Sequence, residues 1–189
     1  MTMAHQPPRQ SPLRMVDGTM PALGEKTHNI PLVGFLEYCL RGIGQVVFMN
    51  SPITGLFILA AMWIYDPWFG FAGTVGVIAS TLAAHALGID RGLIHAGLYG
   101  FNGVLVGLAL ALFLTPTWDV LVVVWVIALS AASSVLMAAL AAVFGAWGVP
   151  PFTLPFNIIT LLFLITGLHV AHGRLGVSVA PAAPVSGGA

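Results

Sequence analysis

The sequence has very little charge. Only 6% of its 189 residues are Asp, Glu, Lys or Arg, whereas about a quarter are charged in an ordinary soluble domain. Acidic and basic residues number six each, so no basic surface for nucleic acid is expected. A single cysteine, Cys39, excludes a disulfide framework and a zinc site built on several cysteines. The chain has no G-x-S-x-G, H-E-x-x-H or C-x-x-C motif, so we expect no enzymatic activity, no cofactor and no metal.

Hydrophobic residues make up 58% of the chain and are collected into long uncharged windows. A bilayer crossing needs about 20 consecutive apolar residues. Three of the windows are long enough for one crossing each, and a fourth is long enough for two. The windows are residues 42–65, 67–89, 92–118 and 120–173. The sequence therefore predicts an all-α integral membrane protein of one domain.

Proline and glycine divide the windows further, and a shorter apolar segment precedes them. The first and last segments look too short or too broken to span plainly. Half-helices at membrane depth are tolerated only where their backbone lines a cavity or is buried in protein. The six predicted segments are residues 31–50, 53–65, 67–87, 93–114, 120–144 and 155–167.

The two ends of the chain differ from its centre. Residues 1–30 are polar and proline-rich, without an apolar run near the start, and are interpreted as a tail rather than a cleavable signal peptide. Residues 31–170 form the predicted transmembrane unit. Residues 171–189 have the composition of a flexible tail. A weak excess of Lys and Arg before the first segment favours an inside N-terminus.

Polar side chains within apolar segments are costly unless they are paired or face a cavity. Gln45 has an uncharged amide that donates and accepts hydrogen bonds, so it either joins two helices or contacts a solute. Phe48 follows three residues later and is expected on the same helix face. Glu37 and Arg41 have i,i+4 spacing and are expected to form an ion pair at the membrane surface.

A glycine-rich stretch, LYGFNGVLVG, begins the segment before residue 114. Phe101 and Leu105 are helical neighbours that face either the core or a solute. Asn102 is placed where it can cap the helix. Two rows of small residues predict close helix packing. These rows are Gly103, Gly107 and Ala111 in one segment, and Ser130, Ser134, Ala138 and Ala142 in the next.

The stretch VPPFTLPFN, residues 149–157, contains three prolines. A residue before proline avoids the helical region, so an extended backbone is expected here. Its carbonyl oxygens then have no helical partner. They either line a polar path or accept hydrogen bonds from the side chains of Thr153 and Asn157.

Three stretches together resemble the urea transporter family: LRGIGQVVFMNSPITGLFIL (40–59), GLYGFNGVLVGLAL (97–110) and PPFTLPFNIITLLFL (150–164). They occur in the family's order and cover about residues 33–168. The resemblance implies passive, channel-like transport of urea in a cell membrane, with the bacterial inner membrane expected. It also implies five transmembrane helices and one re-entrant pore helix, which form one repeat of an inverted-repeat fold.

The resemblance also assigns roles to particular residues. Gln45 matches the glutamine at the wide mouth of the urea path. Thr153 matches a hydroxyl at its narrow centre. Backbone carbonyls near Phe101 and around 153–156 match a row of oxygens that accepts the N–H groups of urea. Phe48, Phe101 and Leu105 match a flat apolar slot, whereas Asn102, Pro155, Phe156 and Asn157 match structural or backbone positions of the pore.

The matched part corresponds to the first of two homologous halves, so one copy is expected to line one side of a pore. The expected partners are membrane lipid, transported urea and either a further copy or a separately encoded second half. Further copies would form an antiparallel pair or a trimer of pores. Alternatives are a channel for ammonia, short amides or water, and a membrane subunit that conducts nothing.

Overall fold

The computed structural model describes residues 30–115, 117–170 and 178–179. This part of the chain forms seven α-helices and one antiparallel pair of two-residue strands. The predicted tails, 1–30 and 171–189, fall almost entirely outside the described residues. The helices are α2 (Pro31–Gln45), α3 (Pro52–Tyr65), α4 (Pro67–Ala86), α5 (Arg91–His95), α6 (Phe101–Phe113), α7 (Val120–Gly145) and α8 (Leu154–Val170), and the strands are β1 (Leu114–Thr115) and β2 (Ser178–Val179).

Proline and aspartate determine where several helices begin. Helices α2, α3 and α4 each have proline in the first turn, where its missing N–H costs nothing. Before α4, the Asp66 carboxylate accepts the N–H groups of Trp68 at 2.8 Å and Phe69 at 3.1 Å. Asp90 and Asp119 cap α5 and α7 in the same way. Each aspartate in the described residues therefore caps a helix.

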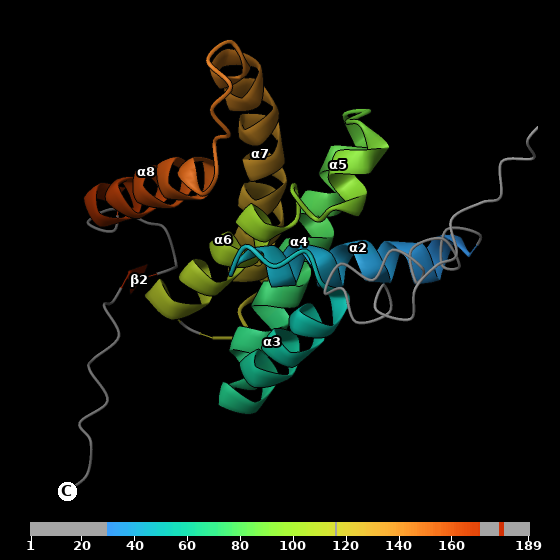
Figure 1. Cartoon of the computed structure of the whole chain (residues 1–189). Helices are drawn as coiled ribbons and strands as arrows, with labels where there is room; N and C mark the ends of the chain where they lie inside the picture. Colours follow the sequence, from blue (N-terminus) through green and yellow to red (C-terminus); the bar gives the residue numbers. More distant parts are fainter. Residues whose placement is uncertain (1–29, 116, 171–177, 180–189) are drawn as a thin grey trace, which may run out of the picture.

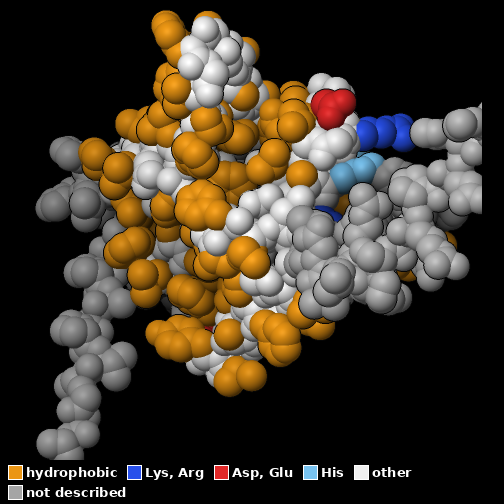
Figure 2. Space-filling model, viewed as in Figure 1, with side chains coloured by type: hydrophobic (Ala, Val, Ile, Leu, Met, Phe, Trp, Pro, Cys, Tyr) orange, Lys and Arg blue, Asp and Glu red, His pale blue; other side chains and the backbone are white. Residues whose placement is uncertain are grey.

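The helices are apolar, and two of them are long enough to cross a bilayer. Within the described residues these two are α4 and α7, whereas α3, α6 and α8 are apolar but shorter. Hydrophobic side chains cover much of the face shown in Figure 2. An apolar surface of this extent is typical of a protein that contacts lipid.

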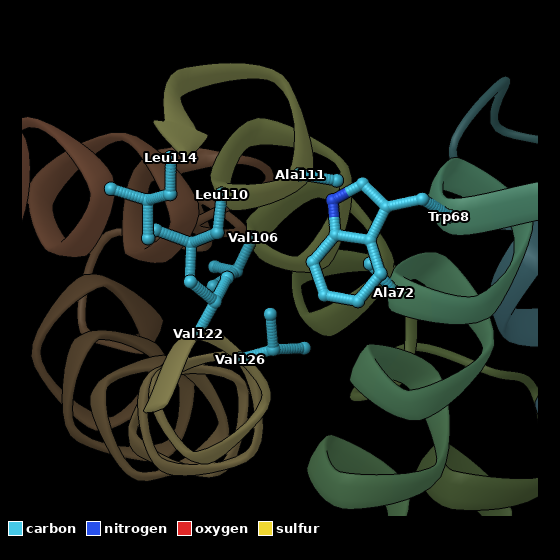
Figure 3. Close-up of a cluster of buried hydrophobic side chains, with 8 residues drawn as sticks. All are labelled: Trp68, Ala72, Val106, Leu110, Ala111, Leu114, Val122 and Val126. Carbon is cyan, nitrogen blue, oxygen red and sulfur yellow. The ribbon is translucent and has the colours of Figure 1, made fainter. Parts of the chain in front are cut away.

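The core lies where α4, α6 and α7 meet. Trp68 and Ala72 of α4 pack with Val106 and Leu110 of α6 and with residues from the first turns of α7 (Figure 3). In Figure 1, α7 runs upright, and α2 and α8 extend to opposite sides across its direction. The loop after α2 and the turn before α8 are in contact through the rings of Phe48 and Phe152.

The predicted segment 93–114 is not one helix. It is divided into α5 and α6 by a turn at 96–100. Gly97 has φ +75°, and a Cβ there would overlap the α2 backbone at Arg41 and Gly42. Gly100 also packs directly against Gly42. The helix is interrupted because α2 crosses it at this turn, a contact that the periodicity of the segment does not reveal.

The two predicted rows of small residues are packing surfaces. A Cβ at Gly103 would overlap the Ser80 side chain, and one at Gly107 would overlap the α4 backbone at Ala72. Ser130 and Ser134 of α7 are completely buried. Ala142 at the other end of that row is exposed, because the C-terminal end of α7 projects beyond the other helices (Figure 1).

We expect Gly103→Val to lower the thermal unfolding midpoint of the protein in detergent micelles. The added methyl groups meet Ser80 and the α4 backbone, and overpacking of this kind costs about 1–3 kcal/mol. Gly145→Val is the matched control, because a Cβ at Gly145 has no neighbour within 4 Å. Equal midpoints for the two variants would contradict the close packing of α4 and α6.

Candidate functional site

Two phenylalanine rings from distant parts of the chain meet at the surface. Phe48 lies in the loop after α2, and Phe152 lies in the turn before α8. Their ring centroids are 5.9 Å apart, and their planes are inclined at 85°. Both side chains are exposed, Phe48 at 66% and Phe152 at 51%. Edge-to-face contact at this distance is favourable for aromatic rings.

Phe48 does not share a helix face with Gln45, contrary to the sequence-based expectation. Helix α2 ends at Gln45, and the next residues form a turn in which the Phe48 N–H donates to the Gln45 carbonyl at 2.9 Å. Phe48 has φ 59°, in the left-handed region, so the chain reverses its course there. The direction of the Phe48 ring therefore depends on the conformation of this loop and not on the face of α2.

Gln45 joins α2 to the turn between α5 and α6. Its side-chain nitrogen donates to the Ala96 carbonyl at 2.9 Å, and the side chain is half-buried. This bond uses one N–H of the amide, and an amide oxygen can accept hydrogen bonds from other donors. The hydrogen bond supports the helix-joining interpretation of Gln45, and it leaves the amide oxygen compatible with solute contact.

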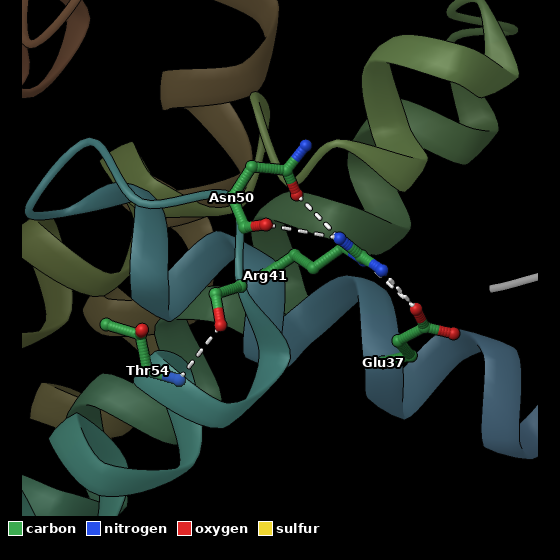
Figure 4. A network of polar contacts seen from close by, with 5 residues as sticks. Glu37, Arg41, Asn50 and Thr54 are labelled. Atoms are coloured by element: carbon green, nitrogen blue, oxygen red, sulfur yellow. Dashed lines mark hydrogen bonds and ion pairs between the residues drawn. The ribbon is translucent and has the colours of Figure 1, made fainter. Parts of the chain in front are cut away.

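Arg41 holds the loop that carries Phe48. Its guanidinium donates to the Glu37 carboxylate at 2.7 and 3.0 Å, and to the side-chain and backbone oxygens of Asn50 at 2.9 and 3.3 Å (Figure 4). The predicted ion pair is therefore present. It is buried, with Glu37 4% and Arg41 6% exposed, rather than at the surface. A buried pair needs such additional hydrogen bonds to offset its desolvation.

Phe101 and Leu105 are neighbours on α6, as predicted, but they differ in exposure. Phe101 is only 4% exposed and belongs to a buried cluster with Tyr99 and Met137. Leu105 is half-buried and packs against the same cluster. In the single chain, Phe101 therefore lies within the core.

Asn102 bonds to the segment before α8 instead of capping α6, which has no side-chain cap. Its nitrogen donates to the Phe152 carbonyl at 3.1 Å, and its oxygen accepts the Phe156 N–H at 3.3 Å. The side chain is completely buried. One amide therefore joins the start of α6 to both ends of the turn that contains Thr153.

The backbone carbonyls near Phe101 have donors within the chain. The carbonyls of Tyr99, Gly100 and Gly103 accept from serine hydroxyls at 3.2–3.4 Å. The donors are Ser134, Ser80 and Ser130, which lie on α7 and α4. These oxygens therefore face the interior of the bundle, although each carbonyl can accept a second hydrogen bond.

Thr153 lies in the turn immediately before α8 and is half-buried. Its carbonyl accepts the Asn157 N–H at 3.0 Å, as in the first turn of a helix. Pro155 is buried, Phe156 is half-buried and Asn157 is exposed. Residues 149–151 belong to no helix or strand, and α8 begins at Leu154, one residue before the predicted start.

Sequence reasoning missed two members of this region, Phe152 and Asn50. Phe152 was part of the motif that led to Thr153, but nothing in the motif indicates a phenylalanine with φ 49°. Asn50 appeared only as a break between segments. The bond between Asn50 and Arg41 spans a chain reversal, whose geometry no local pattern specifies.

These features define an apolar, helical membrane protein. The half-buried polar groups, Gln45 and Thr153, carry no charge and lie in segments next to the exposed rings. The buried ion pair is neutralised within the protein.

The chain belongs to the urea transporter family, because the family model described as urea transporter matches residues 36–188. It is 40% identical over 165 residues to urea transporter 1 of Rattus norvegicus and 38% identical over 165 residues to that of Mus musculus. Each alignment covers 83% of this chain and 41% of the relative. Urea transporter 1 of Ovis aries is 40% identical over 138 residues, or 71% of this chain and 35% of the relative. The chain thus spans about two fifths of the length of the first two relatives.

We expect Asn102→Ala to destabilise the protein, because it leaves the Phe152 carbonyl and the Phe156 N–H without their partner. An unsatisfied buried polar group costs about 1–3 kcal/mol. Asn157→Ala is the control, since the Asn157 side chain is exposed. Unfolding in detergent measures both, and equal stability of the two variants would exclude a structural role for the Asn102 amide.

Proposed function

We propose that this chain lines one side of a channel-like path through which urea crosses the membrane down its concentration gradient. One observation supports the proposal most directly. The exposed ring of Phe48 contacts Phe152, the residue before Thr153, in a chain of the urea transporter family. The relatives at about 40% identity that are named urea transporter 1 add support.

The chemistry of urea suits such a path. Urea is small, planar and neutral, with four N–H donors and one carbonyl acceptor. Uncharged oxygens accept the N–H groups in succession, while ring faces replace lost water by dispersion contacts. An ion finds no opposite charge to offset its dehydration, which costs tens of kcal/mol in a medium of low dielectric constant. Several weak sites in series permit entry without trapping.

The residue roles follow from the family resemblance and the observed exposures. Gln45 offers its amide oxygen at the wide mouth, and Thr153 offers its hydroxyl at the narrow centre. Phe48 and Leu105 form an apolar wall, and Phe101 supports that wall from the core in the single chain. Pro155 and Phe156 belong to the first turn of α8, where the backbone N–H groups of Phe156 and Asn157 bond to the Asn102 side chain and the Thr153 carbonyl.

The path in one chain is open on one side, because Phe48 and Phe152 are exposed. We propose that a second copy in the inverted orientation, or a separate homologous half, covers this side, and that three such pores associate. In this arrangement α8 is the re-entrant pore helix of a repeat with five membrane crossings. The expected location is the bacterial inner membrane.

We expect Thr153→Val and Gln45→Ala each to slow urea flux about twofold to tenfold, because one hydrogen bond contributes about 0.5–1.5 kcal/mol. Stopped-flow shrinkage of proteoliposomes measures the flux. Thr166→Val is the matched control, since Thr166 is exposed on α8 and bonds only to its own helix in the contacts observed. Wild-type flux no faster than that of empty vesicles would defeat the proposed function for this chain alone.

An antiparallel pair requires that copies insert in both orientations. We expect a single cysteine at Ala189, introduced in a Cys39→Ser background, to react with a membrane-impermeant maleimide from both faces of the membrane. Labelling of intact and permeabilised cells distinguishes the two populations. Reaction from one face only would exclude the antiparallel pair and favour a separately encoded half.

A further inference from the structure

A cavity opens at the end of the helix bundle where α4 and α7 begin. Its volume is about 330 Å³, within the range of about 300–1,000 Å³ that is typical of small-molecule sites. Its walls come from the connection between α3 and α4, from the end of α6 and from the loop before α7. The lining includes three aromatic residues, Tyr65, Trp68 and Phe69, together with Asp66, Ala111 and Leu112.

The cavity lies at the level of one membrane surface. It is next to the N-terminal ends of α4 and α7, the two described helices that are long enough to cross a bilayer. Trp68 near the start of α4 and Trp118 before α7 have ring centroids 5.1 Å apart, so both helices begin at the same end of the bundle. Tyrosine and tryptophan are enriched where a protein meets lipid headgroups. The cavity is therefore within reach of the headgroup layer.

Two polar groups at the cavity have hydrogen-bonding capacity that the described residues do not use. The Trp68 side chain is 3% exposed, and its indole N–H has no partner in the described part of the chain. Buried N–H groups without an acceptor are rare in native proteins. In Figure 3 the indole nitrogen is turned towards Ala111, which also lines the cavity. The Asp66 carboxylate caps α4 through Oδ1, and its second oxygen makes none of the hydrogen bonds observed in the described residues.

A negative charge beside aromatic rings suits a cation. Asp66 is exposed, and the rings of Tyr65 and Phe69 next to it have centroids 5.4 Å apart and planes inclined at 71°. Aromatic faces attract ammonium groups. The basic side chains Arg41 and Arg91 of the described residues do not line the cavity. The site therefore fits a ligand with an ammonium group and with oxygen atoms that can accept hydrogen bonds.

We propose that this cavity binds the headgroup of a membrane phospholipid that carries an ammonium group, as phosphatidylethanolamine does. The ammonium group lies against the Asp66 carboxylate and the rings of Tyr65 and Phe69. A phosphate or ester oxygen accepts the indole N–H of Trp68. The acyl chains remain in the bilayer. This site is separate from the proposed urea path, and its test does not depend on urea flux.

The test measures lipid binding to the purified full chain by native mass spectrometry in detergent. We expect phosphatidylethanolamine to bind about fivefold more tightly than phosphatidylglycerol, whose headgroup has no ammonium group. Asp66→Asn keeps a capping oxygen for α4 but removes the charge, so it should abolish this preference. Asp90→Asn is the matched control, because Asp90 is also an exposed aspartate that caps a helix, beyond the other end of α4. The preference should persist in Asp90→Asn.

A second pair of variants tests the indole N–H. Trp68→Phe keeps an aromatic ring and removes the donor, so it should weaken phosphatidylethanolamine binding about twofold to tenfold, as expected for one hydrogen bond. Trp147→Phe removes an exposed indole after the C-terminal end of α7. It should leave the binding unchanged. Equal binding to Trp68→Phe and the wild type would contradict the assigned role of the indole.

Other outcomes would overturn the proposal as a whole. These are equal affinity for the two lipids, or a preference that persists in Asp66→Asn. Soluble phosphoethanolamine that displaces the lipid at equal concentration would show that the ligand is not a membrane lipid. Should Asp66→Asn fail to fold, Leu112→Trp replaces it. Leu112 is 40% exposed and lines the cavity, so the larger side chain fills the site, and unchanged phosphatidylethanolamine binding overturns the inference.

Discussion

Backbone polar groups that leave a helix within an apolar protein must find partners inside it, and this requirement organises the region around the candidate site. Three of the interruptions between helices are residues 46–51, 96–100 and 146–153. Each of these interruptions has a backbone carbonyl that accepts a hydrogen bond from the side chain of a helix residue. The donors Arg41, Gln45 and Asn102 bind the carbonyls of Asn50, Ala96 and Phe152, respectively.

These hydrogen bonds depend on very close packing between backbones. Glycines at positions 42, 97 and 100 bring α2 against the turn between α5 and α6, which places Ala96 within reach of Gln45. Gly103 and Gly107 bring α6 against α4 in the same manner. Small residues and polar side chains thus act together. The glycines allow the helices to approach closely, and the polar side chains donate hydrogen bonds to the backbone carbonyls at the interruptions.

Much of the fold was predictable from local rules. Proline in the first turn and aspartate at the N-cap locate the starts of α3, α4 and α7, because both act within a few residues along the chain. Spacing identified the Glu37–Arg41 pair and the small-residue rows. It did not reveal that the pair is buried, that Phe48 leaves the helix or that the segment 93–114 divides. Each of these depends on which element packs nearby.

The amino-acid sequence by itself determined an apolar helical chain of the urea transporter family and the segments that carry its polar residues. It did so because hydropathy, capping and motif spacing are properties of neighbouring residues. Only the tertiary structure decided three contacts. The Asn102 side chain donates to the Phe152 carbonyl, the Arg41 guanidinium donates to Asn50, and the ring of Phe48 contacts the ring of Phe152. These contacts join segments far apart in the chain, and their geometry follows from how the helices cross.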